Sequence, residues 1–330
     1  MKMKKLFGYF LVLLLSMSFS VANAEWVVDT PENHGMSTVL LKNAADKIRK
    51  IGGRQGFVVI RDGVLIYEKY YYGNKDTPNI AFSVTKSFGA TLVGIAYTMG
   101  LLDLDDPVSK WIDKPDSTIN KNATIQHLLS QTAQEDPPGT TFKYNSGAVV
   151  NTLSTIVSKA SGMKTKDFAK KYLMEPLGIR YYLWLPDNKG NVPFGAGIIA
   201  SCRDLVRLGQ MYLNGGTWNG QVILSKEFIH ETTDPSFPEA NACYCFLWWL
   251  NQDAGTWHTT LGTLCKTGTG KMIEGAPANS YRPQGFFGQM IHVIPDLKIV
   301  AVSMGITPNL ESWYTNNEFW EAIAPCLPVY

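Results

Sequence analysis

Short apolar runs rich in β-branched and aromatic residues lie toward both ends of the chain, whereas in its middle the apolar positions recur every three to four residues. Near the start, GFVVIRDGVLIYEKYYYG (residues 56–73) contains two β-rich runs joined at Arg61-Asp62-Gly63, which predicts a hairpin. The preceding STVLLKNAADKIRKIGG (37–53) has a helical period and ends in glycines, as helices often do.

From residue 83 to about 215 the period is mainly helical, as in SGAVVNTLSTIVSKASG (146–162) and SCRDLVRLGQMYLNGG (201–216). Strand patterns return in CYCFLWWLNQ (243–252) and in GFFGQMIHVIPDLKIVAVSMG (285–305), a second hairpin that turns at Pro295-Asp296, and a last helix is expected within 311–324. This order predicts an α+β fold with a mainly antiparallel sheet flanked by helices and an inserted helical region. The expected sheet part covers about 25–82 and 240–330 of one domain, and the helical part about 83–239.

The first 24 residues, MKMKKLFGYFLVLLLSMSFSVANA, have the basic start, apolar core and small-x-small end of a secretory signal peptide. We expect cleavage after Ala24, and a soluble periplasmic or secreted protein without stable membrane insertion. Without Lys2, Lys4 and Lys5, the remaining 27 basic residues nearly balance the 28 acidic ones. This balance does not favour a nucleic acid or an anionic membrane as a partner.

The five cysteines are Cys202, Cys243, Cys245, Cys265 and Cys326. Their odd number means that they cannot all pair within one chain, even in an oxidising compartment. Cys243, Cys245 and Cys265 together with His258 could suggest a metal site, but their spacing fits no zinc pattern. We therefore expect packing or a single disulfide there, and no metal. The disulfide pattern and the oligomeric state remain open.

One stretch combines an apolar helix with two chemically useful residues: AFSVTKSFGATLVGIAYTMG (81–100). If Ser83 begins the helix, Lys86 lies one turn later on the same face, so that its amine can approach the hydroxyl. Burial lowers the pKa of a lysine, and a neutral amine can act as the base for a serine nucleophile. A helix cap with a snorkelling lysine is the alternative. A second Ser-x-x-Lys, Ser161 to Lys164, follows a helix and is predicted to be a solvated turn.

A second motif lies in PPGTTFKYNSGAVV (137–150), where Tyr144-Asn145-Ser146 precedes a helix. With Ser83 and Lys86, it resembles the serine hydrolases related to class C β-lactamases and penicillin-binding DD-peptidases, whose pattern is Ser-x-x-Lys, Tyr-x-Asn and Lys-Thr-Gly. The resemblance covers most of the chain after residue 24, including EPLGI (175–179) and 201–224. It implies that Tyr144 moves protons to or from the leaving group together with Lys86.

The third motif is ambiguous in this sequence. The sequence contains a literal Lys266-Thr267-Gly268. In the family that it resembles, the Lys-Thr-Gly strand is followed closely by its hairpin partner, because connections between antiparallel neighbours are usually short. Here the next predicted strand, GQMIHVIP, begins only at Gly288. We therefore expect KTGTG to be a loop, and Pro283-Gln284-Gly285-Phe286 to be the strand beside the nucleophile, where Gly285 lets the chain approach closely. The backbone N–H groups of Ser83 and Phe286 would then form the oxyanion hole.

Two substitutions weaken the β-lactam interpretation. Ser146 replaces the asparagine that would hold the substrate amide, and the lysine that would meet the carboxylate of the drug is missing before Gly285. Tyr-x-Ser with GFFGQ looks more like the 6-aminohexanoate-oligomer hydrolases and related esterases. Ser146, Gly285 and Trp248 are candidate substrate-binding residues, whereas Tyr181 and Trp184 could line the pocket or belong to the core.

The expected function is that of an exported serine hydrolase that cleaves a small amide or ester through an acyl-enzyme on Ser83, with no cofactor. A class C-type β-lactamase or DD-peptidase is one alternative, and a non-catalytic protein that binds cell-wall peptides is another. Ser83, Lys86 and Tyr144 together favour an enzyme. The chain contains neither Gly-x-Ser-x-Gly nor His-Glu-x-x-His, which argues against α/β-hydrolase and zinc-peptidase chemistry. The natural substrate remains open.

Overall fold

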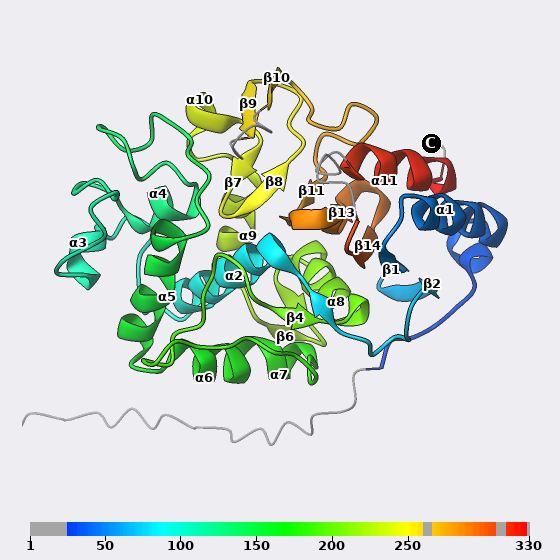
Figure 1. Cartoon of the computed structure of the whole chain (residues 1–330), viewed down its shortest axis with the longest axis horizontal. Coiled ribbons are helices and arrows are strands. Elements are labelled where there is room, and N and C mark those ends of the chain that lie inside the picture. The colour runs from blue at the N-terminus through cyan, green and yellow to red at the C-terminus, as the bar shows by residue number, and fades with distance from the viewer. Residues whose placement is uncertain (1–24, 260–265, 308–314, 329–330) are drawn as a thin grey trace, which may run out of the picture.

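A computed structural model describes residues 25–259, 266–307 and 315–328. The predicted signal peptide and Cys265 lie outside the described residues. The architecture is α+β, as expected, with an eight-stranded antiparallel sheet and helices around it (Figure 1). The strands follow the order β2-β1-β14-β13-β11-β8-β7, and β12 pairs with β13. Their bounds are β1 Arg54–Arg61, β2 Val64–Tyr70, β7 Tyr244–Cys245, β8 Trp248–Leu250, β11 Tyr281–Arg282, β12 Gln284–Gly285, β13 Gln289–Ile294 and β14 Ile299–Gly305.

Both predicted hairpins are confirmed, and β1 pairs with β14, so that the two ends of the chain meet in one sheet. The β1–β2 turn has positive φ at Asp62 and Gly63, a geometry that suits the twist of a two-residue hairpin. The β13–β14 turn is a short 3-10 helix over Pro295–Leu297. These turns agree with local sequence signals, because proline, aspartate and glycine favour such backbone angles.

Helices cover both faces of the sheet. On one face, α1 (Thr38–Lys50) packs against α11 (Thr315–Ile323), and Phe57 of β1 packs against Phe319 of α11. On the other face, α8 (Cys202–Leu213) contacts β1, β13 and β14. The sequence assigned α8 to the inserted helical part, but its apolar side lies directly on the sheet. Helical periodicity identifies a helix and does not say what the helix packs against.

The inserted region is built around α2 (Thr85–Thr98), whose first twelve residues are all buried. It contacts α5 (Ala148–Ser161), and α3, α4 and α5 lie together on the left of Figure 1. A helix buried on all sides explains the continuous apolar character of residues 88–96. The remaining helices are α3 Val108–Trp111, α4 Ile125–Leu129, α6 Thr165–Ala169, α7 Glu175–Leu177, α9 Lys226–Thr233 and α10 Pro238–Asn241, with a π-helical turn over Lys170–Met174.

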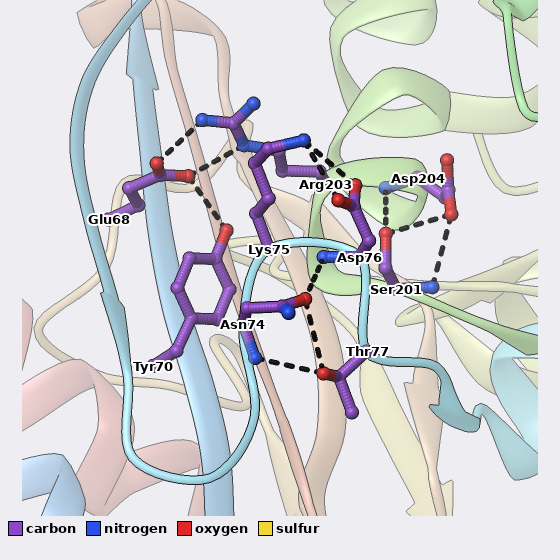
Figure 2. A network of polar contacts seen from close by, with 9 residues as sticks. All are labelled: Glu68, Tyr70, Asn74, Lys75, Asp76, Thr77, Ser201, Arg203 and Asp204. Atoms are coloured by element: carbon purple, nitrogen blue, oxygen red, sulfur yellow. Dashed lines mark hydrogen bonds and ion pairs between the residues drawn. The ribbon is translucent and has the colours of Figure 1, made fainter.

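Polar contacts attach the edge strand β2 to α8 (Figure 2). Arg203 donates two hydrogen bonds to the Glu68 carboxylate, at 2.7 Å from Nε and 2.6 Å from Nη2, and the Tyr70 hydroxyl donates a third at 2.7 Å. Burial would raise the pKa of Glu68, but these hydrogen bonds outweigh it and lower the pKa. The next loop is shaped by Asn74 and Thr77 and leads through β3 (Asn79–Ile80) toward Ser83.

The structure corrects one expectation about the strands. Lys266–Thr269 is not a loop but a strand, β10, which pairs with β9 (Thr256–Thr259) in a separate two-stranded sheet. The Gly/Thr-rich sequence favours a loop locally, and only the pairing with β9 makes it a strand.

Within the described residues, Cys202, Cys243, Cys245 and Cys326 are buried free thiols. No helix there is apolar and long enough to cross a bilayer, and no metal-ligand cluster of three or more His, Cys, Asp or Glu side chains occurs there.

Candidate active site

Ser83 lies in a single 3-10 turn, Phe82–Val84, that leads directly into α2. Phe82 has φ 46°, an uncommon left-handed conformation for an aromatic residue, and its carbonyl accepts a 2.5 Å hydrogen bond from the Thr85 hydroxyl. The Thr85 hydroxyl in turn accepts from the N–H of Ile198. The backbone before Ser83 is therefore held in a strained shape by its surroundings, a feature that concentrates at functional sites.

Lys86 has its amine beside the Ser83 hydroxyl. The Lys86 Nζ atom lies 3.0 Å from Ser83 Oγ, 2.7 Å from Ser146 Oγ and 2.8 Å from the carbonyl oxygen of Gly195. The side chain is only 1% exposed, so it does not snorkel to solvent. The structure thus brings together the two residues of the first motif. The second Ser-x-x-Lys does not share this geometry, because the Ser161 hydroxyl bonds back to Val157 within its own helix.

Burial lowers the pKa of Lys86 to about 7. Within the described residues no carboxylate pairs with it, and its three partners are a carbonyl and two hydroxyls. Removing water disfavours the charged form, while these neutral acceptors restore only part of its stabilisation. A substantial fraction of Lys86 is therefore a neutral amine at neutral pH and can accept a proton.

Tyr144 lies on the other side of the same cluster. Lys86 Nζ is 4.6 Å from the centre of the Tyr144 ring, and the phenol hydrogen-bonds with Ser83. Burial raises the pKa of Tyr144 to about 12, although the hydrogen bond with Ser83 acts in the opposite direction. The phenol therefore stays protonated at neutral pH and can donate a proton. Its ring stacks on Trp249 at 5.8 Å.

Three residues that hold the tyrosine loop were missed by the sequence reasoning: Gln131, Asn151 and Gly195. The Gln131 side chain accepts from the N–H of Asn145, and Asn151 Oδ1 accepts from the N–H of Gly195 at 3.1 Å. A Cβ at Gly195 would overlap the carbonyl oxygen of Ser146. The PFGAG stretch (193–197) was the only signal available, and it does not reveal which segment approaches it.

The segment 283–286 lies where the third motif was expected. β12 contacts the 3-10 turn of Ser83, and a Cβ at Gly285 would overlap the carbonyl oxygen of Ala81. Gly285 thus allows the close approach that the sequence predicted. After β12 the chain does not continue directly as a strand, because Phe286–Gly288 forms a tight turn with Phe287 in a left-handed conformation. Phe286, the predicted oxyanion donor, therefore lies at a turn next to Ser83.

Three aromatic rings pack together beside Ser83. Phe286 and Phe287 are 4.5 Å apart between ring centres, and Phe82 lies 6.2 Å from the first and 5.3 Å from the second. All three side chains are partly exposed. The turns that carry Ser83 and Phe286 thus share an apolar wall, which we call the three-phenylalanine wall.

Other candidate residues lie elsewhere. Lys266 is exposed on β10, outside the main sheet. The prediction that Trp248 binds substrate is wrong: its side chain is fully buried and packs against Tyr212 and Tyr281. Alternation along β8 places Trp249 on the opposite face, and that is the tryptophan that stacks on Tyr144. Tyr181 is 76% exposed, whereas Trp184 is buried and donates to the carbonyl of Pro193 beside the Gly195 segment.

Comparison with models of known protein families identifies the family to which this chain belongs. The model of the family described as Beta-lactamase matches residues 41–305, which is most of the chain and includes every residue of the cluster. The chain belongs to the Beta-lactamase family. It is therefore a Beta-lactamase-family hydrolase, and the resemblance inferred from its motifs is confirmed.

Similarity to individual members is distant. An uncharacterized protein from Alkalihalophilus pseudofirmus is 23% identical over 88% of this chain and 96% of its own length. The 6-aminohexanoate-dimer hydrolase of Paenarthrobacter ureafaciens is 21% identical over 58% of this chain and 63% of that enzyme. The crystal structure of a family VIII carboxylesterase superposes with a TM-score of 0.67 at 14% identity, covering 92% of this chain and 99% of that one. At this level of identity, the structural match shows a shared fold.

Proposed function

We propose that this Beta-lactamase-family protein is a serine hydrolase that cleaves a small amide or ester through an acyl-enzyme on Ser83. The observation that carries the proposal is the 3.0 Å contact between the buried amine of Lys86 and the Ser83 hydroxyl. Burying a lysine amine this deeply costs folding free energy. Such a residue is expected where its lowered pKa serves a reaction. A non-catalytic peptide-binding protein would have no use for it.

The proposed reaction uses two proton carriers. Ser83 Oγ attacks the substrate carbonyl carbon while its proton passes to neutral Lys86 Nζ. The resulting oxyanion accepts hydrogen bonds from the backbone N–H groups of Ser83 and Phe286. The bond to the leaving amine or alcohol then breaks, and Tyr144 gives that group a proton, which Lys86 replaces. Water then attacks the ester carbonyl on Ser83 and gives one proton to the same pair. When the bond to Ser83 Oγ breaks, the pair returns that proton to Oγ, so that the acid is released and Ser83 and Lys86 are restored. The chemistry needs neither a metal nor a cofactor.

The three-phenylalanine wall supports a substrate with an apolar acyl group. Phe82 precedes the nucleophile and Phe286 is the proposed oxyanion donor, so that an acyl chain attached to Ser83 would lie against these rings. Pro283, directly before β12, stands at the position where related β-lactamases have a lysine for the carboxylate of the drug. We therefore favour neutral amides or esters over β-lactams, consistent with the distant similarity to a 6-aminohexanoate-dimer hydrolase and a family VIII carboxylesterase.

We also propose that the enzyme works outside the cytoplasm. The support is the sequence of residues 1–24, with its basic start, apolar core and Ala22-Asn23-Ala24.

A substrate panel tests the proposed function. Purified enzyme would be assayed on nitrophenyl acetate, butyrate and octanoate, on 6-aminohexanoate dimer, on D-alanyl peptides and on nitrocefin, with Ser83→Ala as the control. We expect turnover of neutral esters or amides that Ser83→Ala abolishes, and little turnover of nitrocefin. Hydrolysis that persists in Ser83→Ala would contradict the proposed nucleophile, and efficient nitrocefin turnover would restore the β-lactamase alternative.

A further inference from the structure

The turn that carries Phe286 is supported from behind by a buried arginine. Arg54, at the start of β1, is 3% exposed. Its Nη1 donates to the carbonyl of Phe287 at 3.0 Å, and its Nη2 donates to the carbonyl of Gly288 at 2.8 Å. Two consecutive carbonyls of the turn are therefore fixed by one guanidinium group, whose planar fork suits such paired acceptors.

The remaining donors of Arg54 are also used. Nε and Nη2 donate to Ser303 Oγ at 3.3 and 2.9 Å, and Nη1 donates to Thr307 Oγ1 at 3.3 Å. In the part of the chain that the structure describes, no carboxylate pairs with Arg54. Burial lowers the pKa of Arg54 to about 10, so the group still carries its charge at neutral pH. A buried cation supported only by hydroxyls and carbonyls is an expensive way to stabilise a fold.

A second side chain fixes the first carbonyl of the same turn. Gln289 Nε2 donates to the carbonyl of Phe286 at 3.1 Å and to that of Gly305, while Gln289 Oε1 accepts from the N–H of Gly305. The carbonyls of Phe286, Phe287 and Gly288 thus all accept from buried side chains. These contacts stabilise the left-handed conformation of Phe287, which would otherwise be unfavourable.

We propose that Arg54 and Gln289 are positioning residues for oxyanion stabilisation: the hydrogen bonds of Arg54 to Phe287 and Gly288, and that of Gln289 to Phe286, together hold the turn that presents the Phe286 N–H to the reacting carbonyl. The inference rests on the proposed function, because it assumes that Phe286 serves Ser83. Oxyanion donors must be oriented before the reaction to be effective, and a small displacement weakens them. The positive charge of Arg54 adds to the field that favours the oxyanion.

Two substitutions at Arg54 distinguish the contribution of its paired hydrogen bonds from that of its positive charge, and a third substitution is the matched control. Arg54→Lys keeps the charge and loses the paired geometry, whereas Arg54→Gln loses both. Thr307→Val removes one hydroxyl acceptor from the same guanidinium and leaves its bonds to the turn intact. Each variant would be assayed for kcat and KM on a nitrophenyl ester and for its rate of labelling by a fluorophosphonate, and its folding would be checked by circular dichroism and thermal unfolding.

We expect Arg54→Lys to lower kcat and the labelling rate by about 100-fold, the typical effect of losing one oxyanion donor, and Arg54→Gln to lower both further because it also removes the charge, with KM changed by less than about threefold in each variant. Thr307→Val should lower the melting temperature while kcat stays within about threefold of wild type. Folded Arg54 variants with wild-type kcat would overturn the inference, as would an equal loss of kcat in Thr307→Val.

If the Arg54 variants do not fold, Gln289→Met takes their place, because it releases the carbonyl of Phe286 and leaves Arg54 unchanged. The same selective loss of kcat is expected, and wild-type kcat in folded Gln289→Met would overturn the inference. Ser83→Ala distinguishes this result from a failure of the proposed function: an active Ser83→Ala would refute the nucleophile itself, whereas an inactive Ser83→Ala with active Arg54 variants would refute only the role of Arg54.

Discussion

At the residue scale, the protonation state of Lys86 determines whether Ser83 can be activated. Burial lowers the pKa of this lysine to about 7, and only the neutral amine accepts a proton. We therefore expect kcat/KM to fall as the pH decreases through about 7 and to reach a plateau above about pH 8. Lys86→Arg, which stays protonated at all these pH values, should lose activity by orders of magnitude. A pH–rate profile of both proteins provides the measurement, and near-normal turnover by Lys86→Arg would assign the base to Tyr144.

The same buried amine should also affect stability. Its pKa is about 7 in the folded chain and near 10.5 in the unfolded chain, so between these values the unfolded chain binds more protons. Wild-type stability should consequently gain up to about 1.4 kcal/mol per pH unit across this window from this group, whereas Lys86→Met lacks the gain. Urea unfolding of both proteins at pH 7 and pH 9.5 tests this. A stability difference that does not shift toward wild type at the higher pH would contradict the lowered pKa.

At the element scale, the loop that carries Tyr144 depends on its contact with the segment around Gly195. A methyl group at Gly195 would collide with the Ser146 carbonyl and displace the loop from Lys86. Gly195→Ala should therefore reduce kcat by at least about tenfold while the sheet and its helices remain folded. Ester hydrolysis together with near-ultraviolet circular dichroism checks the prediction, and wild-type kcat would show that the loop tolerates the displacement.

The two candidates for the third motif give opposite predictions. Lys266 is exposed on β10, so Lys266→Ala should leave activity almost unchanged. Phe286→Pro should inactivate the enzyme, because it deletes the N–H proposed for the oxyanion, whereas Phe286→Ala keeps that N–H and should remain substantially active toward short acyl esters. Assays of the three variants on nitrophenyl acetate decide between the candidates. An inactive but folded Lys266→Ala would favour the strand around Lys266 and a β-lactamase-like substrate.

At the scale of the whole molecule, the fold was predictable wherever local signals determine it. Both hairpins have turn residues with the required backbone angles, and the motifs around Ser83 and Tyr144 identified the family. Residues whose importance comes from distant contacts were not predictable: nothing near Arg54 in the sequence indicates Phe287, and nothing near Asn151 indicates Gly195. The same holds for Trp248 and Trp249. Alternation along a strand places their side chains on opposite faces of the sheet, but the sequence does not show which face lies toward the site.

The predicted export of the whole chain can be tested on the protein as it is made. If residues 1–24 form a signal peptide, protein recovered from the periplasm or the medium should begin at Glu25. Expression of the full sequence in a bacterial host, followed by N-terminal sequencing and intact mass measurement, gives the answer. Full-length protein confined to the cytoplasm would contradict the proposal.

The central claim is that Ser83, activated by Lys86, carries the acyl group during turnover. The most direct test is to trap that bond: the enzyme is treated with a fluorophosphonate or rapidly quenched during turnover of a slow ester, and the modified peptide is located by mass spectrometry. We predict a single adduct on Ser83 in the wild-type protein, no adduct in Ser83→Ala, and strongly slowed labelling in Lys86→Arg. An adduct on another residue, or turnover with unmodified Ser83, would contradict the account.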